Sequence, residues 1–136
     1  MPFPDYQPTT PEFLRAVCTA NAERDLIVYE GERLSYGDAQ RRSARLARGL
    51  LASGIGKGTH IGLLMPNNPD FVVAWFAAAR IGAVVIPINT FYKARELAFV
   101  LGHADIEVLL TTDRLLNNDY LERLLACIPA LATHDA

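Results

Sequence analysis

The sequence predicts an α/β fold in which a mostly parallel sheet is flanked by helices, as repeated βα units. Two observations support this prediction. Short, almost continuously apolar segments alternate along the chain with amphipathic segments of about ten to eighteen residues. Glycines and Xaa-Pro pairs lie at the joints, where they end or begin helices. Because parallel strands are joined by long right-handed crossovers, the alternation favours βαβ units.

The joint at residues 79–89 shows the pattern most clearly. Gly82 follows an apolar helical segment, at a position where a residue without Cβ adopts the left-handed conformation easily. The segment from Val84 to Ile88 is apolar at nearly every position, which predicts a strand covered on both faces. Pro87 has no N–H to donate, so we expect it at the strand's end, at an edge or in a bulge.

Length and composition are consistent with one domain. The chain has 136 residues, 51% of them hydrophobic, which is enough to bury a core. We expect an extended arm at residues 1–9, a single α/β domain at residues 10–128 and a frayed tail at residues 129–136. The net charge of -2 gives no reason to expect nucleic acid or an acidic membrane as a partner.

The first predicted helix begins at the Thr10-Pro11-Glu12 segment, with the threonine as N-cap and the proline at the first helical position. It is expected to run to about Asn21. Its predicted inward-facing residues are Phe13, Leu14, Val17 and Cys18.

A hairpin and a long helix follow. Short strands are predicted at residues 26–30 and 33–34, joined by a tight turn. Ser35, with Asp38 three residues later, predicts a variant of the capping box at the start of the helix, which Gly54 ends. The apolar stripe of this helix is expected to comprise Tyr36, Ala39, Leu46, Ala47, Leu50 and Leu51.

The next βα pair begins with a strand predicted at residues 59–65. Asn68 is the expected N-cap and Pro69 the first residue of a helix that runs to Ile81. This helix is apolar almost all round, so we expect it to be buried between two layers, and Gly82 to end it.

The last third of the chain predicts two more helices and one more strand. The first helix is expected at residues 93–101, with Gly102 just beyond its C-terminus. A strand is predicted at residues 106–111. Thr112-Asp113 is the expected cap of a last helix through about Ala126.

The glycine-rich segment Gly54–Gly58 superficially suggests a phosphate-binding loop. Such a loop follows a strand and opens a helix, so that helix amides meet the phosphate. Here a predicted helix comes before the glycines and a strand after them, and no Ser or Thr directly follows Lys57. We therefore interpret the segment as a structural turn.

Other signals of catalysis or metal binding are lacking. Cys18 and Cys127 lie far apart and have no CxxC spacing, which favours small buried thiols in a reducing compartment. His60, His103 and His134 have no metal-ligand spacing, and no serine lies in a GxSxG context. We predict no catalytic residue and no metal ligand in this chain.

Arginines gather on one face of the long predicted helix. Arg41, Arg42, Arg45 and Arg48 are opposed within that helix only by Asp38. Such a face binds anions or a partner in some proteins, and it is more often simply solvated. The sequence favours the solvated face.

The loop after the strand at residues 84–88 is the candidate ligand site. It leaves the carboxyl end of a parallel strand, where open α/β sheets bind ligands. Asn89, Thr90 and Phe91, followed by Tyr92, offer an amide, a hydroxyl and two aromatic rings. Two interpretations stay open: these groups hydrogen-bond and stack on a ligand, or the aromatic rings only pack beneath the loop.

We expect a cytoplasmic location. The N-terminus has neither a basic region nor an apolar region typical of a signal peptide. The longest apolar runs, such as residues 71–79, are too short to cross a bilayer.

Several segments resemble, in order, the motifs of one family. They are residues 33–39 (like LTYxEL), residues 45–50 and 54–59 (like LAxxLxxxGVxxGDxV), residues 65–71 (like LPNSPEF), residues 79–89 (like KxGAVxVPLNPxY), and residues 96–97 with 108–110 (like EL…VLIT). The resemblance covers roughly residues 13 to 125. It is to the acyl-CoA synthetase, or AMP-dependent synthetase and ligase, superfamily of adenylate-forming enzymes, with the fatty-acyl-CoA ligases most similar.

The resemblance implies a fold and an activity. The chain would form the N-terminal subdomain of an enzyme that joins a carboxylic or fatty acid to AMP from ATP and then passes the acyl group to coenzyme A. ATP, Mg²⁺ and coenzyme A are implied for the full-length family. In relatives, the loop corresponding to residues 89–91 can border the coenzyme A side of the cleft.

The family's chemistry-bearing motifs are absent from the sequence. It has no TSGTTGxPKG phosphate loop, no YGxTE segment, no TGD motif with the ribose-binding aspartate, and no counterpart of the catalytic lysine. We therefore expect no cofactor in this chain and no adenylation by it alone. Its expected partner is the remainder of the ligase, or a second or partner chain, bound through an apolar face.

Two other functions stay open. The first is a short, non-catalytic binding or scaffold module that keeps the fold and pairs with a partner chain. The second is a free-standing nucleotide-binding α/β domain. Oligomeric state in solution tests the first, and a thermal shift with ATP, AMP or coenzyme A tests the second.

Overall fold

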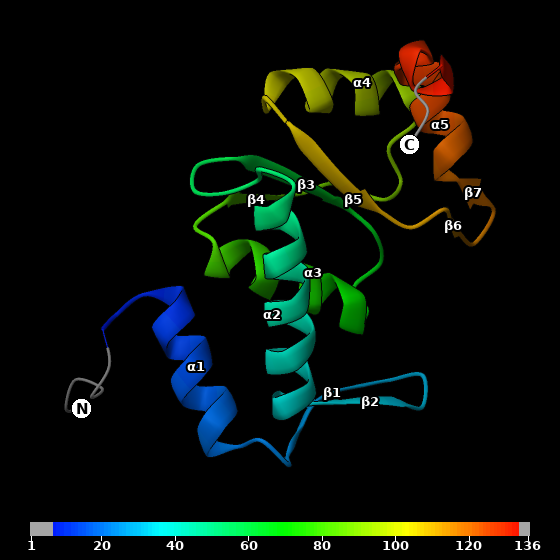
Figure 1. Cartoon of the computed structure of the whole chain (residues 1–136). Helices are drawn as coiled ribbons and strands as arrows, with labels where there is room; N and C mark the ends of the chain where they lie inside the picture. Colours follow the sequence, from blue (N-terminus) through cyan, green and yellow to red (C-terminus); the bar gives the residue numbers. More distant parts are fainter. Residues whose placement is uncertain (1–6, 134–136) are drawn as a thin grey trace. The chain divides into compact units, whose positions relative to one another are not determined.

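The computed structural model describes residues 7–133 (Figure 1). The described chain divides into two compact units. The first unit runs up to Gly58 and includes Asn67–Val84, and the second comprises Thr59–Pro66 and the residues from Val85 onward. The prediction of one domain at residues 10–128 concerns independent folding and stays a prediction. Residues 1–6 of the expected arm and 134–136 of the expected tail lie outside the described residues.

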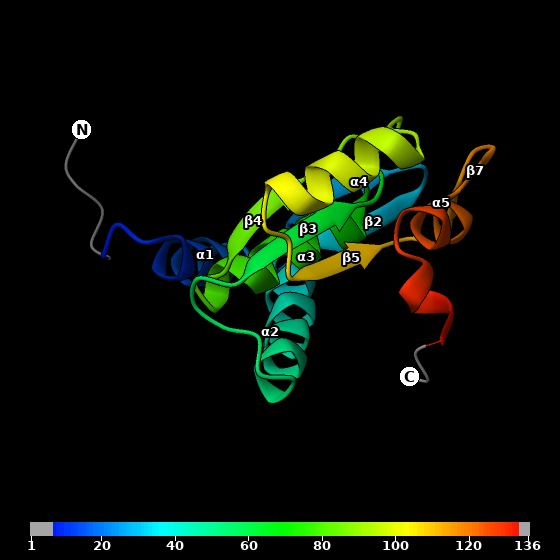
Figure 2. The same ribbon diagram turned by 90° about the horizontal axis from the view of Figure 1, so that it is seen from above.

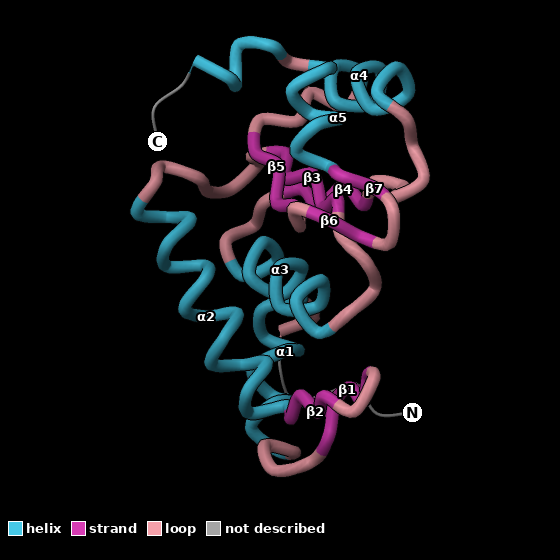
Figure 3. The backbone as a smooth tube through the Cα atoms, turned by 90° about the vertical axis from the view of Figure 1, so that its right-hand side faces the viewer, coloured by secondary structure: helices cyan, strands magenta, loops and turns pink. Residues whose placement is uncertain are grey.

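Helices and one hairpin build the first unit (Figure 3). They are α1 (Thr10–Ala20), β1 (Asp25–Tyr29), β2 (Glu32–Ser35), α2 (Tyr36–Ala52) and α3 (Pro69–Arg80). Helix α2 packs against both α1 and α3. The core between the hairpin, α2 and α3 consists of Leu34, Ala39 and Val73, with Leu26, Ile27, Leu46 and Phe76 packed around it.

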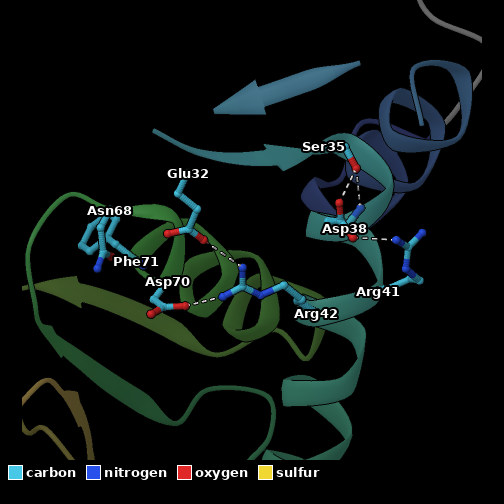
Figure 4. A network of polar contacts seen from close by, with 8 residues as sticks. All are labelled: Glu32, Ser35, Asp38, Arg41, Arg42, Asn68, Asp70 and Phe71. Carbon is cyan, nitrogen blue, oxygen red and sulfur yellow. Dashed lines mark hydrogen bonds and ion pairs between the residues drawn. The ribbon is translucent and has the colours of Figure 1, made fainter. Parts of the chain in front are cut away.

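Side-chain caps begin α2 and α3 as the sequence predicts. The Ser35 side chain accepts the Asp38 amide at 3.0 Å, and its hydroxyl donates to the Asp38 carboxylate at 2.7 Å. The Asn68 side chain accepts the Phe71 amide at 3.0 Å and caps α3 (Figure 4). Helix α1 differs, because its N-cap is Thr9 and no side chain caps it.

Two large apolar residues, Phe13 of α1 and Leu51 of α2, were expected in the core of the first unit and are exposed. Phe13 lies beside the buried face of α1, which Leu14 and Cys18 form at a four-residue spacing. Leu51 is 54% exposed because it follows Leu50, the last buried residue of the α2 stripe.

Helix α3 buries a stripe rather than its whole surface, contrary to the prediction. The buried stripe after Pro69 consists of small or branched residues, Val73, Ala74, Ala77 and Ala78. Trp75 lies off this stripe and is 40% exposed, with its ring edge-to-face against Phe71 at 5.7 Å between centroids. An apolar composition therefore does not decide which side of this helix is covered.

The second unit is built on a three-stranded sheet of order β4-β3-β5 (Figure 2). The strands are β3 (His60–Leu64), β4 (Val84–Pro87) and β5 (Val108–Thr111), and β3 and β5 are parallel. Helices α4 (Ala94–His103) and α5 (Tyr120–Cys127) pack together and against the sheet. The core that joins them consists of Leu64, Ile88, Leu97, Tyr120 and Leu124.

A glycine lets the core of the second unit close over the middle strand. A Cβ placed on Gly62 would lie 3.0 Å from the side chains of Ile88 and Leu109 and 3.1 Å from Ile106. Those three side chains occupy the space that a larger residue at position 62 would need. A β3 strand with alanine there would have to push the core apart.

The edge strand and the end of α4 differ from the sequence predictions. Val84 and Pro87 are exposed, because β4 lies at the edge of the sheet, although Pro87 does end the strand as predicted. Gly102 lies within α4 rather than beyond it. Asp105 takes the left-handed position (φ 49°), and the Ile106 amide returns to the Leu101 carbonyl at 3.2 Å.

The segment after β5 forms a hairpin that was not predicted from the sequence. Strands β6 (Arg114–Leu115) and β7 (Asn118–Asp119) pair antiparallel, and α5 begins only after them. Asp119, not Thr112-Asp113, caps α5 by accepting the Glu122 amide at 2.9 Å. A 3-10 helix, η1 (Pro129–Thr133), occupies the described part of the expected tail.

Candidate functional site

The candidate site lies at the carboxyl edge of the parallel sheet in the second unit. The Thr111 hydroxyl donates to the Leu64 carbonyl at 2.8 Å, which joins the ends of β5 and β3. The Ile88 amide donates to the Leu63 carbonyl at 2.9 Å and extends the pairing of β4 by one residue. The loop that follows Ile88 therefore starts from a fixed point on this edge.

Asn89, Thr90, Phe91 and Tyr92 form one tight turn. The Tyr92 amide donates to the Asn89 carbonyl at 3.2 Å, and the Asn89 side-chain oxygen accepts the Phe91 amide at 2.9 Å. The three candidate residues are thus brought together in a single structure. The amide oxygen of Asn89 is engaged within the turn, so its NH₂ group is the part that remains to contact a ligand.

The two aromatic rings of the turn have different surroundings. Tyr92 is half-buried and packs against the core of the second unit. Phe91 is 73% exposed. Packing beneath the loop therefore accounts for Tyr92 and does not account for Phe91. Ligand binding by Asn89, Thr90 and Phe91 stays a prediction.

Helix α5 holds the backbone of this turn. The hydroxyl of Tyr120 donates to the Thr90 carbonyl at 2.9 Å, and the Arg123 guanidinium donates to the Tyr92 carbonyl at 2.9 Å. Arg123 also lies over the Tyr120 ring, 5.7 Å from its centroid. Sequence reasoning missed both residues, since they lie about thirty positions from their partners and belong to a helix whose start was misplaced.

A surface hollow of about 500 Å³ lies beside the turn. It is lined by Tyr92, Arg95, Glu96, Phe99 and Val100. The exposed Phe99 ring stacks on His103, with 5.1 Å between centroids. The spacing of Arg95, Phe99 and His103 at every fourth position of α4 is the sequence signal that could have found this face.

Electrostatics support the helix that holds the turn. Asp119 accepts the Glu122 amide at the N-terminus of α5 and pairs with Arg114 at 3.0 Å. The backbone amide of Glu122 first, and Arg114 second, lower the pKa of Asp119. A carboxylate at this helix terminus therefore stays ionised.

The glycine-rich turn Gly54–Gly58 is hydrogen-bonded within the first unit. The Gly58 amide donates to the Gly82 carbonyl at 3.0 Å, so this amide of the glycine-rich turn is engaged within the protein. Between residues 7 and 133, no group of three or more His, Cys, Asp or Glu side chains is arranged to hold a metal ion. Over the same residues, no helix is long and apolar enough to cross a bilayer.

The arginines of α2 form mainly a solvated face. Arg41 pairs with Asp38 at 2.6 Å, and Arg42 pairs with Glu32 and Asp70 (Figure 4). Arg45 is exposed and has no ion pair among the residues that the structure describes. The Ser35 hydroxyl, with Arg41, lowers the pKa of Asp38.

Comparison with known proteins supplies the family. The family model of the AMP-binding enzymes matches residues 14–135. An acyl-CoA ligase, sidI, from Aspergillus fumigatus is 41% identical over 98 residues, covering 72% of this chain and 16% of the relative. An acyl-CoA ligase, SID4, from Ajellomyces capsulatus is 34% identical over 116 residues, covering 84% of this chain and 20% of the relative.

Solved structures show the same fold. The fatty acyl CoA synthetase of Mycobacterium tuberculosis superposes with a TM-score of 0.74 at 28% identity, over 93% of this chain and 24% of that one. The chain therefore spans between about a sixth and a quarter of the length of these three proteins.

Proposed function

Because this chain belongs to the AMP-binding enzyme family and matches its N-terminal portion, we propose that it serves as the N-terminal subdomain of an ATP-dependent acid–CoA ligase. The ligase would join a carboxylic or fatty acid to AMP from ATP, releasing pyrophosphate, and coenzyme A would then displace AMP to give the thioester. The single observation that carries the proposal is the family match over residues 14–135.

We propose that the chain does not catalyse adenylation alone. Charge develops at the α-phosphate during this step, and ligases stabilise it with phosphate-loop amides, Mg²⁺ and cationic side chains. The sequence contains no phosphate loop, and the described residues include no carboxylate cluster that fits Mg²⁺. The groups that stabilise this charge would therefore belong to the remainder of the ligase.

The turn at residues 89–92 would border the coenzyme A side of the cleft. In support, it leaves the carboxyl end of β4, and both Phe91 and Asn89 are exposed. An aromatic ring and an amide donor can stack on and hydrogen-bond to an organic ligand. The resulting contribution is binding and orientation of coenzyme A, with no bond made or broken by the turn.

The remainder of the ligase is the partner that we propose. The second unit presents exposed apolar side chains from α5 through its C-cap into η1, namely Leu121, Leu125, Ile128 and Leu131. A groove of about 330 Å³ beside these side chains is lined mainly by apolar residues, among them Leu109 and Leu124. Such surfaces favour burial against another part of a protein.

We also propose a cytoplasmic location. The two free cysteines support a reducing, cytoplasmic location.

A scaffold module that pairs with a partner chain is the alternative, and the same exposed apolar side chains support it. The genomic sequence beyond Ala136 separates the two. A continuing reading frame with a Thr/Ser/Gly-rich loop ending in lysine supports the ligase. A frame that stops without such a loop contradicts the ligase and supports the scaffold, which should then form a stable complex with a second chain in light scattering.

A further inference from the structure

We propose that Tyr120 and Arg123 are positioning residues for the turn at residues 89–92. Helix α5 would fix the backbone of this turn so that Phe91 and the Asn89 NH₂ group face a ligand in one defined arrangement. The identity of that ligand, coenzyme A, rests on the proposed function. The positioning of the turn rests only on contacts within the second unit.

One face of α5 makes all the contacts that carry the proposal. Tyr120, Arg123 and Cys127 follow one another at spacings of three and four residues, which places them on the same side of a helix. Their side chains donate, respectively, to the carbonyls of Thr90, Tyr92 and Ala94, each at 2.9 Å. The face thus follows the chain from the turn into the first residue of α4.

The α5 side chains donate to backbone carbonyls of the turn, and none of these hydrogen bonds involves a side chain of the turn. The two carbonyls taken by Tyr120 and Arg123 flank Phe91, whose ring stays in solvent. The Asn89 carbonyl and side-chain oxygen are satisfied inside the turn. Holding the backbone of the turn from α5 helps to present Phe91 and the Asn89 NH₂ group in one defined arrangement.

The donors are more firmly held than the turn. Tyr120 is completely buried and packs with Leu64, Ile88 and Leu97 in the core. Arg123 lies over the Tyr120 ring and also donates to the Asn118 side chain. If the turn moved away, the buried Tyr120 hydroxyl would lose its partner, which disfavours such movement. The position of α5 therefore determines the position of the turn.

The first test replaces a single hydroxyl in the 136-residue chain. Tyr120→Phe keeps the ring in the core and removes only the bond to Thr90. Tyr29→Phe is the matched control, because no hydrogen bond of the Tyr29 hydroxyl is found in the described residues. We expect amide exchange at Phe91, Tyr92 and Lys93 to become about five-fold faster in Tyr120→Phe, with β3 and β5 unchanged.

The control should match the wild type at every amide. Unchanged exchange at the turn in Tyr120→Phe would overturn the proposal, and so would an equal acceleration at all amides, which indicates a purely structural role. Arg123→Gln should loosen the turn as Tyr120→Phe does. Arg123→Lys keeps a donor and should restore part of the protection, and loss as large as in Arg123→Gln would contradict the assignment of Arg123.

The second test uses the complete ligase. Tyr120→Phe should raise KM for coenzyme A by about three- to ten-fold, in proportion to one lost hydrogen bond, and leave KM for ATP unchanged. An unchanged KM for coenzyme A despite a loosened turn would overturn the positioning role. A wild-type ligase that forms no acyl-CoA would instead overturn the proposed function, and the exchange experiment would still decide the positioning of the turn.

Discussion

The Arg42 guanidinium of α2 and the Asp70 carboxylate of α3 form an ion pair between residues 28 positions apart in the sequence (Figure 4). Arg42 also pairs with Glu32 of β2 at 3.6 Å, so one side chain links three elements of the first unit. Both carboxylates and the guanidinium are largely exposed. The ion pair therefore contributes little energy, and it is of interest because it connects β2, α2 and α3.

Removing this link should have a small effect on stability. Arg42→Ala should lower the free energy of unfolding by about 0.5–1 kcal/mol, because exposed ion pairs contribute little and water solvates the released carboxylates. Arg45→Ala is the control, since Arg45 is exposed on the same helix without an ion pair in the described residues. Urea unfolding measures both. A loss above about 2 kcal/mol for Arg42→Ala would contradict the solvated character of the pair.

The cap of α3 should matter more. Asn68→Ala removes the acceptor of the Phe71 amide and should cost about 1 kcal/mol of unfolding free energy. Asn68→Asp keeps an acceptor and should recover most of it. The neighbouring exposed Asn67 provides the control, and Asn67→Ala should change the urea midpoint little. Equal losses for Asn67→Ala and Asn68→Ala would refute the capping role.

Two glycines should respond to alanine with opposite signs. Gly62→Ala places a methyl group 3.0 Å from the side chains of Ile88 and Leu109, and overpacking of this kind costs about 1–3 kcal/mol. Gly49→Ala, on the open side of α2, meets nothing within 4 Å and should stabilise the chain by about 0.5–1 kcal/mol. Thermal unfolding of the two variants measures the contrast. A stabilising Gly62→Ala would show that the core around β3 is not closely packed.

Acid should weaken the chain through Asp38 and Asp119, whose pKa values are lowered in the folded protein. A carboxyl with a lowered folded pKa contributes stability above its unfolded pKa of about 3.9 and loses it as the pH falls through the folded value. The loss therefore lies below about pH 4. Asp119→Asn keeps a capping oxygen without the charge, so the acid-induced loss of stability should be smaller. An unchanged acid limb in denaturation from pH 5 to pH 2 would contradict this assignment.

Local sequence signals predicted the parts of the fold that neighbouring residues determine. The caps at Ser35 and Asn68 were predicted because donor and acceptor lie within three residues of each other. The β6–β7 hairpin was missed because its turn at Leu116 and Asn117 contains no glycine or proline. The exposure of Trp75 depends on which neighbours cover α3, and composition alone does not contain that information.

The sequence likewise predicted one part of the candidate site and missed another. The turn at residues 89–92 was predicted from its place after a parallel strand, which a linear pattern reveals. The donors Tyr120 and Arg123 reach it from about thirty positions away, and their roles depend on the packing of α5. A tyrosine and an arginine in an amphipathic helix have many possible partners, so the sequence could not select these two carbonyls.

The most direct test of the central claim is ATP–pyrophosphate exchange measured on two proteins with a panel of carboxylic and fatty acids. One is the 136-residue chain, and the other is a ligase in which this chain is continuous with the phosphate loop and the catalytic lysine. We expect exchange, and acyl-CoA on addition of coenzyme A, only with the longer protein. Exchange by the 136-residue chain alone, or none by the longer protein with any acid, would contradict the claim.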